Sequence, residues 1–120
     1  MARVEFVSYQ SKLILIEDFS NLNPGPELMD TITTAQQLIA TQPPKSVLAL
    51  LDATNAHFDA EVLAAMKKFV VANTPFIKAA AVVGVTGLLH IALNSLAAVS
   101  GREFKTFPDR TAAMEYLVSK

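Results

Sequence analysis

The sequence predicts an α/β protein: a single domain spanning residues 1–120, in which a mixed five-stranded sheet is covered by four helices in the order ββαβαβαβα. The strongest observation is the run over residues 78–117, which reads in succession as strand, tight turn, apolar helix, strand and capped helix. A second is that helical patterns alternate with short apolar runs, which is typical of parallel strands joined by helices. The third is that 120 residues, 52% of them hydrophobic, suffice for one core and leave no room for a second domain.

The N-terminal part of the chain predicts a hairpin followed by a helix. The apolar residues Val4 and Phe6 and the apolar run over residues 13–16 flank the polar break at residues 9–12, which suits a tight connection between antiparallel strands. The turn-forming residues 21–26 follow, and Pro26 stands where the first helical turn tolerates a residue without an N–H. Apolar side chains then recur at helical spacing, namely Leu28, Ile32, Ala35, Leu38 and Ile39.

The middle of the chain predicts a buried strand and a second helix. Pro43-Pro44 ends the first helix, and residues 47–51 form an apolar third strand that ends at Asp52. Asp59 is the expected N-cap of the second helix, because its carboxylate can accept a hydrogen bond from the first helical turn. The inward face of this helix carries Val62, Ala65, Met66, Phe69 and Val70.

The last part predicts two more strands and two more helices. Strands over residues 78–83 and 104–107 flank an apolar helix over residues 85–100, and Pro108-Asp109 begins a final helix. Strands that are separated by helices are expected to lie parallel, with right-handed crossovers. The opening hairpin then supplies the antiparallel pair of a mixed sheet.

Charge and composition exclude several classes of partner. The formal net charge is -1, and Lys and Arg are scattered, so the chain lacks the basic stripe that a nucleic-acid partner requires. Residues 79–101 carry no formal charge, but Gly84, Gly87 and His90 interrupt this run and favour a strand that feeds a helix over a membrane span. Cysteine is absent and the first residues form no signal peptide, so a cytoplasmic location is expected.

Nearly the whole chain resembles a known family, and the likeness is strongest in the C-terminal part. The residues that carry the likeness are Ala80-Ala81-Val82-Val83-Gly84-Val85-Thr86-Gly87, Ser100-Gly101-Arg102, Phe107-Pro108-Asp109 and Ala113-Met114-Glu115-Tyr116-Leu117. They resemble the SpoIIAA-like group of small bacterial proteins, which is related to STAS domains and is grouped by some with the Sec14-type lipid-binding fold. Most members of that group are uncharacterised, so the resemblance implies a fold and, more weakly, a regulatory role.

The resemblance also implies where a regulatory switch would stand. STAS antagonists of anti-sigma factors are switched by phosphorylation of a serine in an Asp-Ser-Ser/Thr-Gly motif at the start of the helix after the third strand. The matching stretch here keeps Asp59 but has Ala60 and Glu61 in place of the hydroxyl residues. Glu61 either supplies a permanent negative charge at that place or complements the helix dipole, as acidic residues in a first turn do.

The best candidate site lies at the carboxyl end of the third strand, where open α/β sheets place their ligands. Asp52, Thr54, Asn55 and His57 offer a carboxylate, a hydroxyl, an amide and an imidazole within one loop, and Thr86 follows the next strand. The alternative is that these residues satisfy turns and helix caps. The candidate binding residues, for a ligand or a partner, are Asp52, Thr54, Asn55, His57, Asp59, Glu61, Thr86 and His90.

No catalytic or metal-binding constellation is recognised in the sequence. His57 and His90 are the only histidines, and neither has a second histidine or a cysteine at a spacing that suits zinc. No G-x-S-x-G nucleophile elbow is present. We therefore expect no metal, no cofactor and no enzymatic activity.

The helix over residues 85–100 is the most direct indication of function. Apolar residues occupy over half of its circumference, whereas packing on one sheet face needs a narrower stripe. The apolar surface of this helix that exceeds such a stripe is expected to contact neighbouring helices, a second copy of the chain or a small apolar ligand. Two hypotheses follow: a non-catalytic interaction module that binds a protein partner or itself, and a carrier or sensor of a small apolar or anionic ligand.

Overall fold

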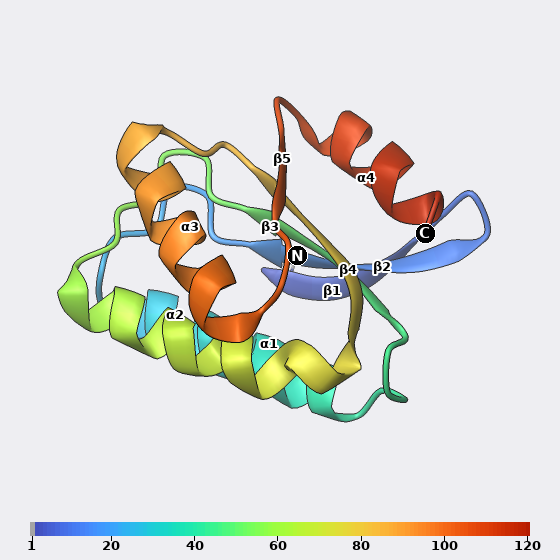
Figure 1. Ribbon diagram of the computed structural model, residues 1–120, viewed down its shortest axis with the longest axis horizontal. Coiled ribbons are helices and arrows are strands. Elements are labelled where there is room, and N and C mark those ends of the chain that lie inside the picture. The colour runs from blue at the N-terminus through green and yellow to red at the C-terminus, as the bar shows by residue number, and fades with distance from the viewer. Residues whose placement is uncertain (1) are drawn as a thin grey trace.

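The computed structural model describes residues 2–120, and all of their side chains except that of Leu88. Its elements follow the predicted order (Figure 1). In chain order they are β1 (Val4–Tyr9), β2 (Lys12–Asp18), α1 (Pro26–Ala40), β3 (Val47–Asp52), α2 (Ala60–Asn73), the 3-10 turn η1 (Thr74–Phe76), β4 (Ile77–Val83), α3 (Gly87–Ser100), β5 (Lys105–Phe107) and α4 (Arg110–Val118). The mixed five-stranded sheet with four helices is thereby confirmed.

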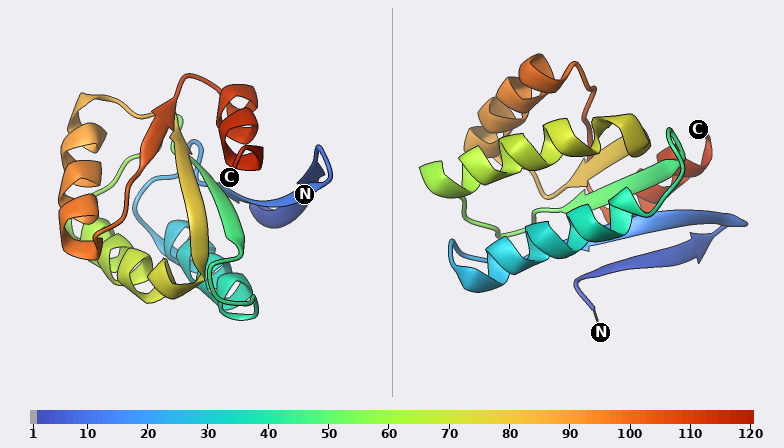
Figure 2. Two further views of the ribbon diagram at one scale, coloured as in Figure 1. Left: turned by 45° about the vertical axis from the view of Figure 1, so that its right-hand side comes forward. Right: turned by 90° about the horizontal axis from the view of Figure 1, so that it is seen from below.

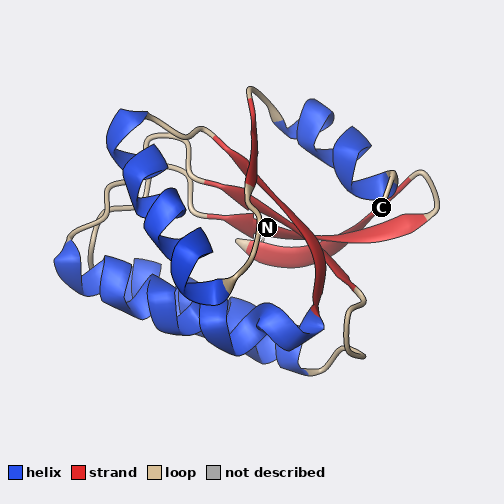
Figure 3. Cartoon of the chain, in the orientation of Figure 1, coloured by secondary structure: helices blue, strands red, loops and turns tan. Residues whose placement is uncertain are grey.

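The five strands lie side by side in chain order, β1-β2-β3-β4-β5. The β1–β2 hairpin is antiparallel and every other neighbouring pair is parallel. Right-handed crossovers between strands that follow one another in this way place all the connecting helices on one face of the sheet. Accordingly α1, α2 and α3 cover one face, and α4, which follows the last strand, covers the other (Figures 2 and 3).

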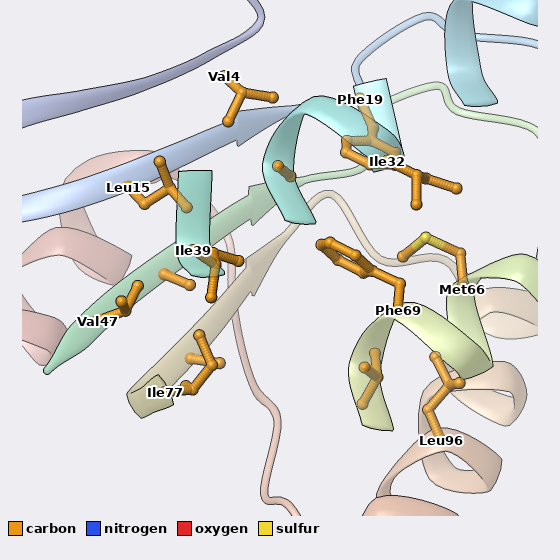
Figure 4. Close-up of a cluster of buried hydrophobic side chains, with 14 of the residues drawn as sticks. Val4, Leu15, Phe19, Ile32, Ile39, Val47, Met66, Phe69, Ile77 and Leu96 are labelled. Atoms are coloured by element: carbon orange, nitrogen blue, oxygen red, sulfur yellow. The ribbon is translucent and has the colours of Figure 1, made fainter. Parts of the chain in front are cut away.

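The sheet separates two hydrophobic clusters. The larger one lies between the sheet and α1 to α3, and it includes Leu15, Phe19, Ile39 and Phe69 (Figure 4). The smaller one lies under α4, where Ile14 and Ile16 of β2 and Leu50 of β3 meet Ala113 and Leu117. Because β2 and β3 are buried on both faces, their sequences are continuous apolar runs, as the sequence predicts for parallel strands.

Some boundaries differ from the sequence-based prediction by one or two residues. Helix α3 begins at Gly87 and not at residue 85, because Thr86 is extended, with φ -107° and ψ 175°, and acts as the N-cap. The turn that precedes Thr86 contains Gly84, which adopts φ +79°. Strand β4 begins at Ile77, one residue earlier than predicted, and β5 begins at Lys105, one residue later than predicted.

Helix α3 is the least buried of the three helices on its face. Among its described side chains only Leu96 is buried, whereas Ile91 is 65% exposed and Val99 is 51% exposed. The helix packs mainly against α2 and has few contacts with the strands (Figure 2). No helix in the described part of the chain has the length and apolar character needed to span a membrane.

Candidate functional site

A surface groove lies where the carboxyl ends of β3 and β4 meet; we call it the edge groove. It has a volume of about 490 Å³, and its polar lining comes from Asn55, His57 and Thr86. The β3–α2 loop supplies the first two residues and the β4–α3 turn supplies the third. The apolar lining comes from Ala53, Ala56, Phe58, Leu63, Leu89 and Ala92. Three of the residues predicted from the sequence are thus brought together at the expected edge of the sheet.

The two loops that form the edge groove are packed directly on each other. The backbone N–H of Ala53 donates to the carbonyl of Val83 over 2.8 Å. A Cβ added at Gly84 would lie 2.6 Å from both the Cα and the backbone nitrogen of Thr54. Such a distance is far below van der Waals contact, so the turn after β4 reaches this position only because residue 84 has no side chain.

Asp52 lies at the same sheet edge but turns away from the edge groove toward α4. Its Oδ1 accepts hydrogen bonds from the backbone N–H of Thr54 (3.0 Å) and the hydroxyl of Thr54 (2.6 Å), and its Oδ2 accepts one from Nε of Arg110 (2.8 Å). Arg110 also lies 3.5 Å from Asp18, the residue that pairs with Asp52 across β2 and β3. Asp52 and Thr54 therefore form the turn and hold the start of α4 to the sheet.

The electrostatics of Asp52 reflect these bonds. Burial by itself raises the pKa of the carboxyl, but the hydrogen bonds from Thr54 and the Arg110 guanidinium outweigh it and leave the pKa below its ordinary value of 3.8. A lowered pKa means that the ionised form is favoured by folding. The stabilisation is therefore present above pH 3.8 and is lost as the pH falls through the lower folded-state value.

Asp52→Ala is expected to lower the free energy of unfolding at pH 7 by about 2–4 kcal/mol, because it removes three hydrogen bonds and leaves the half-buried Arg110 without its closest partner. Urea unfolding measures the change. Asp30→Ala, at an exposed position of α1, is the matched control and should change stability by less than about 0.5 kcal/mol. Equal effects of the two substitutions would contradict the role given to Asp52.

The remaining predicted residues lie outside the edge groove. Asp59 is the N-cap of α2, since its Oδ1 accepts from the N–H of Val62 over 2.8 Å, as predicted. Glu61 is exposed in the first turn of α2 and, with Asp59 and residues 24–26, lines a separate groove of about 390 Å³. His90 is exposed on α3 and does not line the edge groove.

The edge groove contains the N-terminus of α3. The Thr86 side chain makes no capping hydrogen bond with the described residues, and the first turn of α3 carries no acidic residue. The open N–H groups of such a turn favour a negatively charged or hydrogen-bond-accepting group. Within residues 2–120, no three His, Cys, Asp or Glu side chains lie close enough together to hold a metal ion.

A second groove lies between α2 and α3, and sequence reasoning did not locate it; we call it the helix groove. It has a volume of about 410 Å³ and is lined by Leu63, Ala64, Lys67, Ile91, Ala92, Ser95, Leu96 and Val99. It shares Leu63 and Ala92 with the edge groove, so the two depressions adjoin along α3. The sequence shows that α3 has a wide apolar arc. Which residues of that arc stay exposed depends on how α3 packs against α2, and this packing is not evident from the sequence.

Comparison with solved structures identifies the fold. The chain is similar to an uncharacterised protein of the DUF3478 family with a SpoIIAA-like fold from Shewanella loihica, with a TM-score of 0.74 and 20% sequence identity. The similarity covers 95% of this chain and 91% of that chain. The chain therefore has a SpoIIAA-like fold, as the resemblance implied. Neither a protein-family model nor a curated protein matches the sequence.

Proposed function

We propose that this protein is a non-catalytic, cytoplasmic interaction module of the STAS type that associates with a second copy of itself through α3. The observation that carries the proposal is the exposure of α3. A helix that is apolar around most of its circumference is normally buried, yet Ile91 and Val99 of α3 are more than half exposed. Covering these side chains would remove apolar surface from water, which favours association.

The charge of α3 supports a second copy as the occupant. Residues 87–100 contain no Asp, Glu, Lys or Arg, so two identical α3 surfaces can meet without repulsion between like charges. Ile91, Ser95 and Val99 follow one another at intervals of four residues and therefore form one stripe. The small Ser95 between the two larger side chains allows close approach of a second helix. A two-fold axis would place this stripe against its own copy.

The start of α2 supports regulation by a route other than the serine switch of STAS antagonists. Positions 60 and 61 hold Ala and Glu, neither of which has a hydroxyl that a kinase could modify. Glu61 is exposed in the first helical turn, where a permanent negative charge interacts favourably with the helix dipole. An association that lacks this switch is expected to be constitutive with respect to phosphorylation at these positions.

Sedimentation equilibrium tests the proposal. The wild type is expected to form dimers, and Ile91→Asp is expected to weaken dimerisation at least about tenfold, because a charge would be buried in an apolar interface. Leu13→Asp is the matched control, since Leu13 is 60% exposed but lies in the β1–β2 hairpin, far along the chain from α3. A wild type that stays monomeric at high concentration, or equal effects of both substitutions, would contradict self-association through α3.

A carrier of a small apolar ligand is the second candidate, favoured by two cavities beneath α3. They have volumes of about 20 and 40 Å³ and share Met66, Leu93 and Leu96 in their linings. Ligand pockets commonly measure about 300–1,000 Å³, so a ligand would have to lift α3 away from the sheet. Native mass spectrometry of protein purified from its own host distinguishes the candidates: a co-purifying small mass supports the carrier, and a bare dimer supports the module.

A further inference from the structure

Glu17 is a carboxyl side chain buried inside the protein. It lies on β2 with a residue exposure of 3%, and its Oε1 has no hydrogen-bond partner among the described residues. It is paired with Val4 of β1 and points to the face that α1 to α3 cover. A buried carboxylate without hydrogen-bond partners is strongly unfavourable. The question is therefore how the Glu17 side chain is neutralised or hydrogen-bonded in the folded protein.

Glu17 lines the cavity of about 40 Å³ that lies between the sheet and helices α2 and α3. Among the described residues of the lining, the only other charged group is Arg102, and the only uncharged polar side chain is that of Asn73 on α2. The other elements around the cavity present apolar groups, such as Ile39 of α1, Leu51 of β3 and Leu96 of α3. One water molecule needs about 10–15 Å³ of such volume, so the cavity has room for about three or four.

Among the described residues, Arg102 is the one cation whose charge acts on Glu17, but its contacts lie elsewhere. Its Nη1 donates to the carbonyl of Val70 on α2 over 3.2 Å, and its guanidinium lies over the ring of Phe104, 4.9 Å from the centroid. No ion pair joins Arg102 to Glu17 within the described residues. The side chain is half-buried and immediately follows Gly101, the left-handed residue that ends α3. Because Arg102 makes its contacts with other groups, the observed arrangement suits an uncharged Glu17 side chain.

The protonation equilibrium agrees with this geometry. Burial raises the pKa of Glu17 to about 7, and the positive charge of Arg102 offsets only part of that rise. The two protonation states are thus both accessible near neutral pH. The neutral carboxyl has an O–H donor and acceptor oxygens, which water in the cavity can satisfy.

We propose that this cavity is a hydrated proton-binding site, in which protonated Glu17 binds ordered water, and that release of its proton to solvent draws the Arg102 guanidinium from Val70 to the Glu17 carboxylate. The water site and the movement of Arg102 stand independently of dimerisation. Because Arg102 connects the end of α3 to α2, its release also changes how these two helices meet. Any resulting effect on partner binding rests on the proposed function.

Nuclear magnetic resonance of the Ile91→Asp protein tests the site without interference from association. The Glu17 carboxyl carbon and the Arg102 Nε–H are expected to titrate together with a midpoint near pH 7. In Glu17→Gln the Arg102 titration should disappear, whereas Glu5→Gln, at an exposed position on β1, should leave it unchanged. In Arg102→Gln the Glu17 midpoint should rise, because the charge that lowers it has been removed.

A crystal structure at pH 5.5 tests the hydration directly and should show ordered water within hydrogen-bonding distance of Glu17. A Glu17 midpoint near the ordinary 4.5 would overturn the proposal, as would an Arg102 resonance that does not respond to Glu17 or a dry cavity. Since these measurements use a variant in which association through α3 is already weakened, a negative result for the proton site would not contradict the α3 interface. Likewise, a monomeric wild type would contradict the α3 interface but not the proton site.

Discussion

At pH 8 the Glu17→Gln protein is expected to be more stable than the wild type by about 3 kcal/mol. The carboxyl of Glu17 has a pKa of about 7 in the folded protein, against an ordinary value of 4.5, because it is buried. Above pH 7 the wild type therefore bears the free-energy cost of ionising a buried carboxyl group. The Gln side chain has a similar shape and no charge to bury.

The sign of the pH dependence follows from proton binding. Between pH 4.5 and 7 the folded wild type binds more protons at Glu17 than the unfolded chain does, so its stability falls as the pH rises. The contribution of neutral Glu17 is fully present below pH 4.5 and is lost as the pH passes through about 7. At pH 5 the two proteins are expected to differ by less than about 1 kcal/mol.

Urea unfolding of the wild type and Glu17→Gln at pH 5, 6, 7 and 8 measures this difference. Other titrating groups are common to both proteins and largely cancel when the two are subtracted. Glu5→Gln, the exposed control on β1, should follow the wild type at every pH. If the two stability curves ran parallel from pH 5 to pH 8, Glu17 would not be the buried titrating group described above.

Gly84→Ala is expected to lower the free energy of unfolding by more than about 3 kcal/mol. Two effects add: residue 84 has φ +79°, which an L side chain rarely adopts, and the new Cβ would overlap the backbone of Thr54. The backbone at Thr54 cannot rotate away as a flexible side chain would, because Thr54 is held by Asp52. Either the β3–α2 loop or the turn after β4 must therefore move.

Two other glycines separate these effects. Gly101 has φ +69° but open space where a Cβ would be, so Gly101→Ala should cost only about 1–2 kcal/mol for the backbone conformation. Gly87 has neither a positive φ nor a nearby atom, and Gly87→Ala should be neutral or stabilise α3 by up to about 1 kcal/mol. Thermal or urea unfolding of the three variants provides the comparison. If Gly84→Ala cost no more than Gly101→Ala, the overlap with Thr54 would be absent.

Most of the fold could be predicted from the sequence because its boundaries depend on local chemistry. Pro26 begins α1, Asp59 and Asp109 accept the hydrogen bonds that begin α2 and α4, and apolar runs predict the doubly covered strands. The start of α3 was predicted too early because Val85 fits the apolar arc of the helix. Periodicity alone does not reveal that the chain turns at Gly84 and that Thr86 is extended.

The candidate site could be predicted only in part, because long-range contacts decide its details. Asn55, His57 and Thr86 share the edge groove, since loops at the carboxyl ends of neighbouring parallel strands meet. The orientation of Asp52 depends on Arg110, 58 positions away in the chain, and no local pattern specifies it. Glu17 gave one signal, because alternation along β2 places it on the same face as Leu15. That signal alone does not show how completely α2 and α3 would enclose it.

The position of α4 has a consequence for folding of the chain. Since every crossover helix lies on the opposite face, Ile14, Ile16, Leu48 and Leu50 are covered by a single helix that is made after all five strands. During folding, this side of the sheet stays bare until residues 110–118 pack on it. An apolar sheet surface exposed for that interval is a natural target for chaperones and, without them, for aggregation.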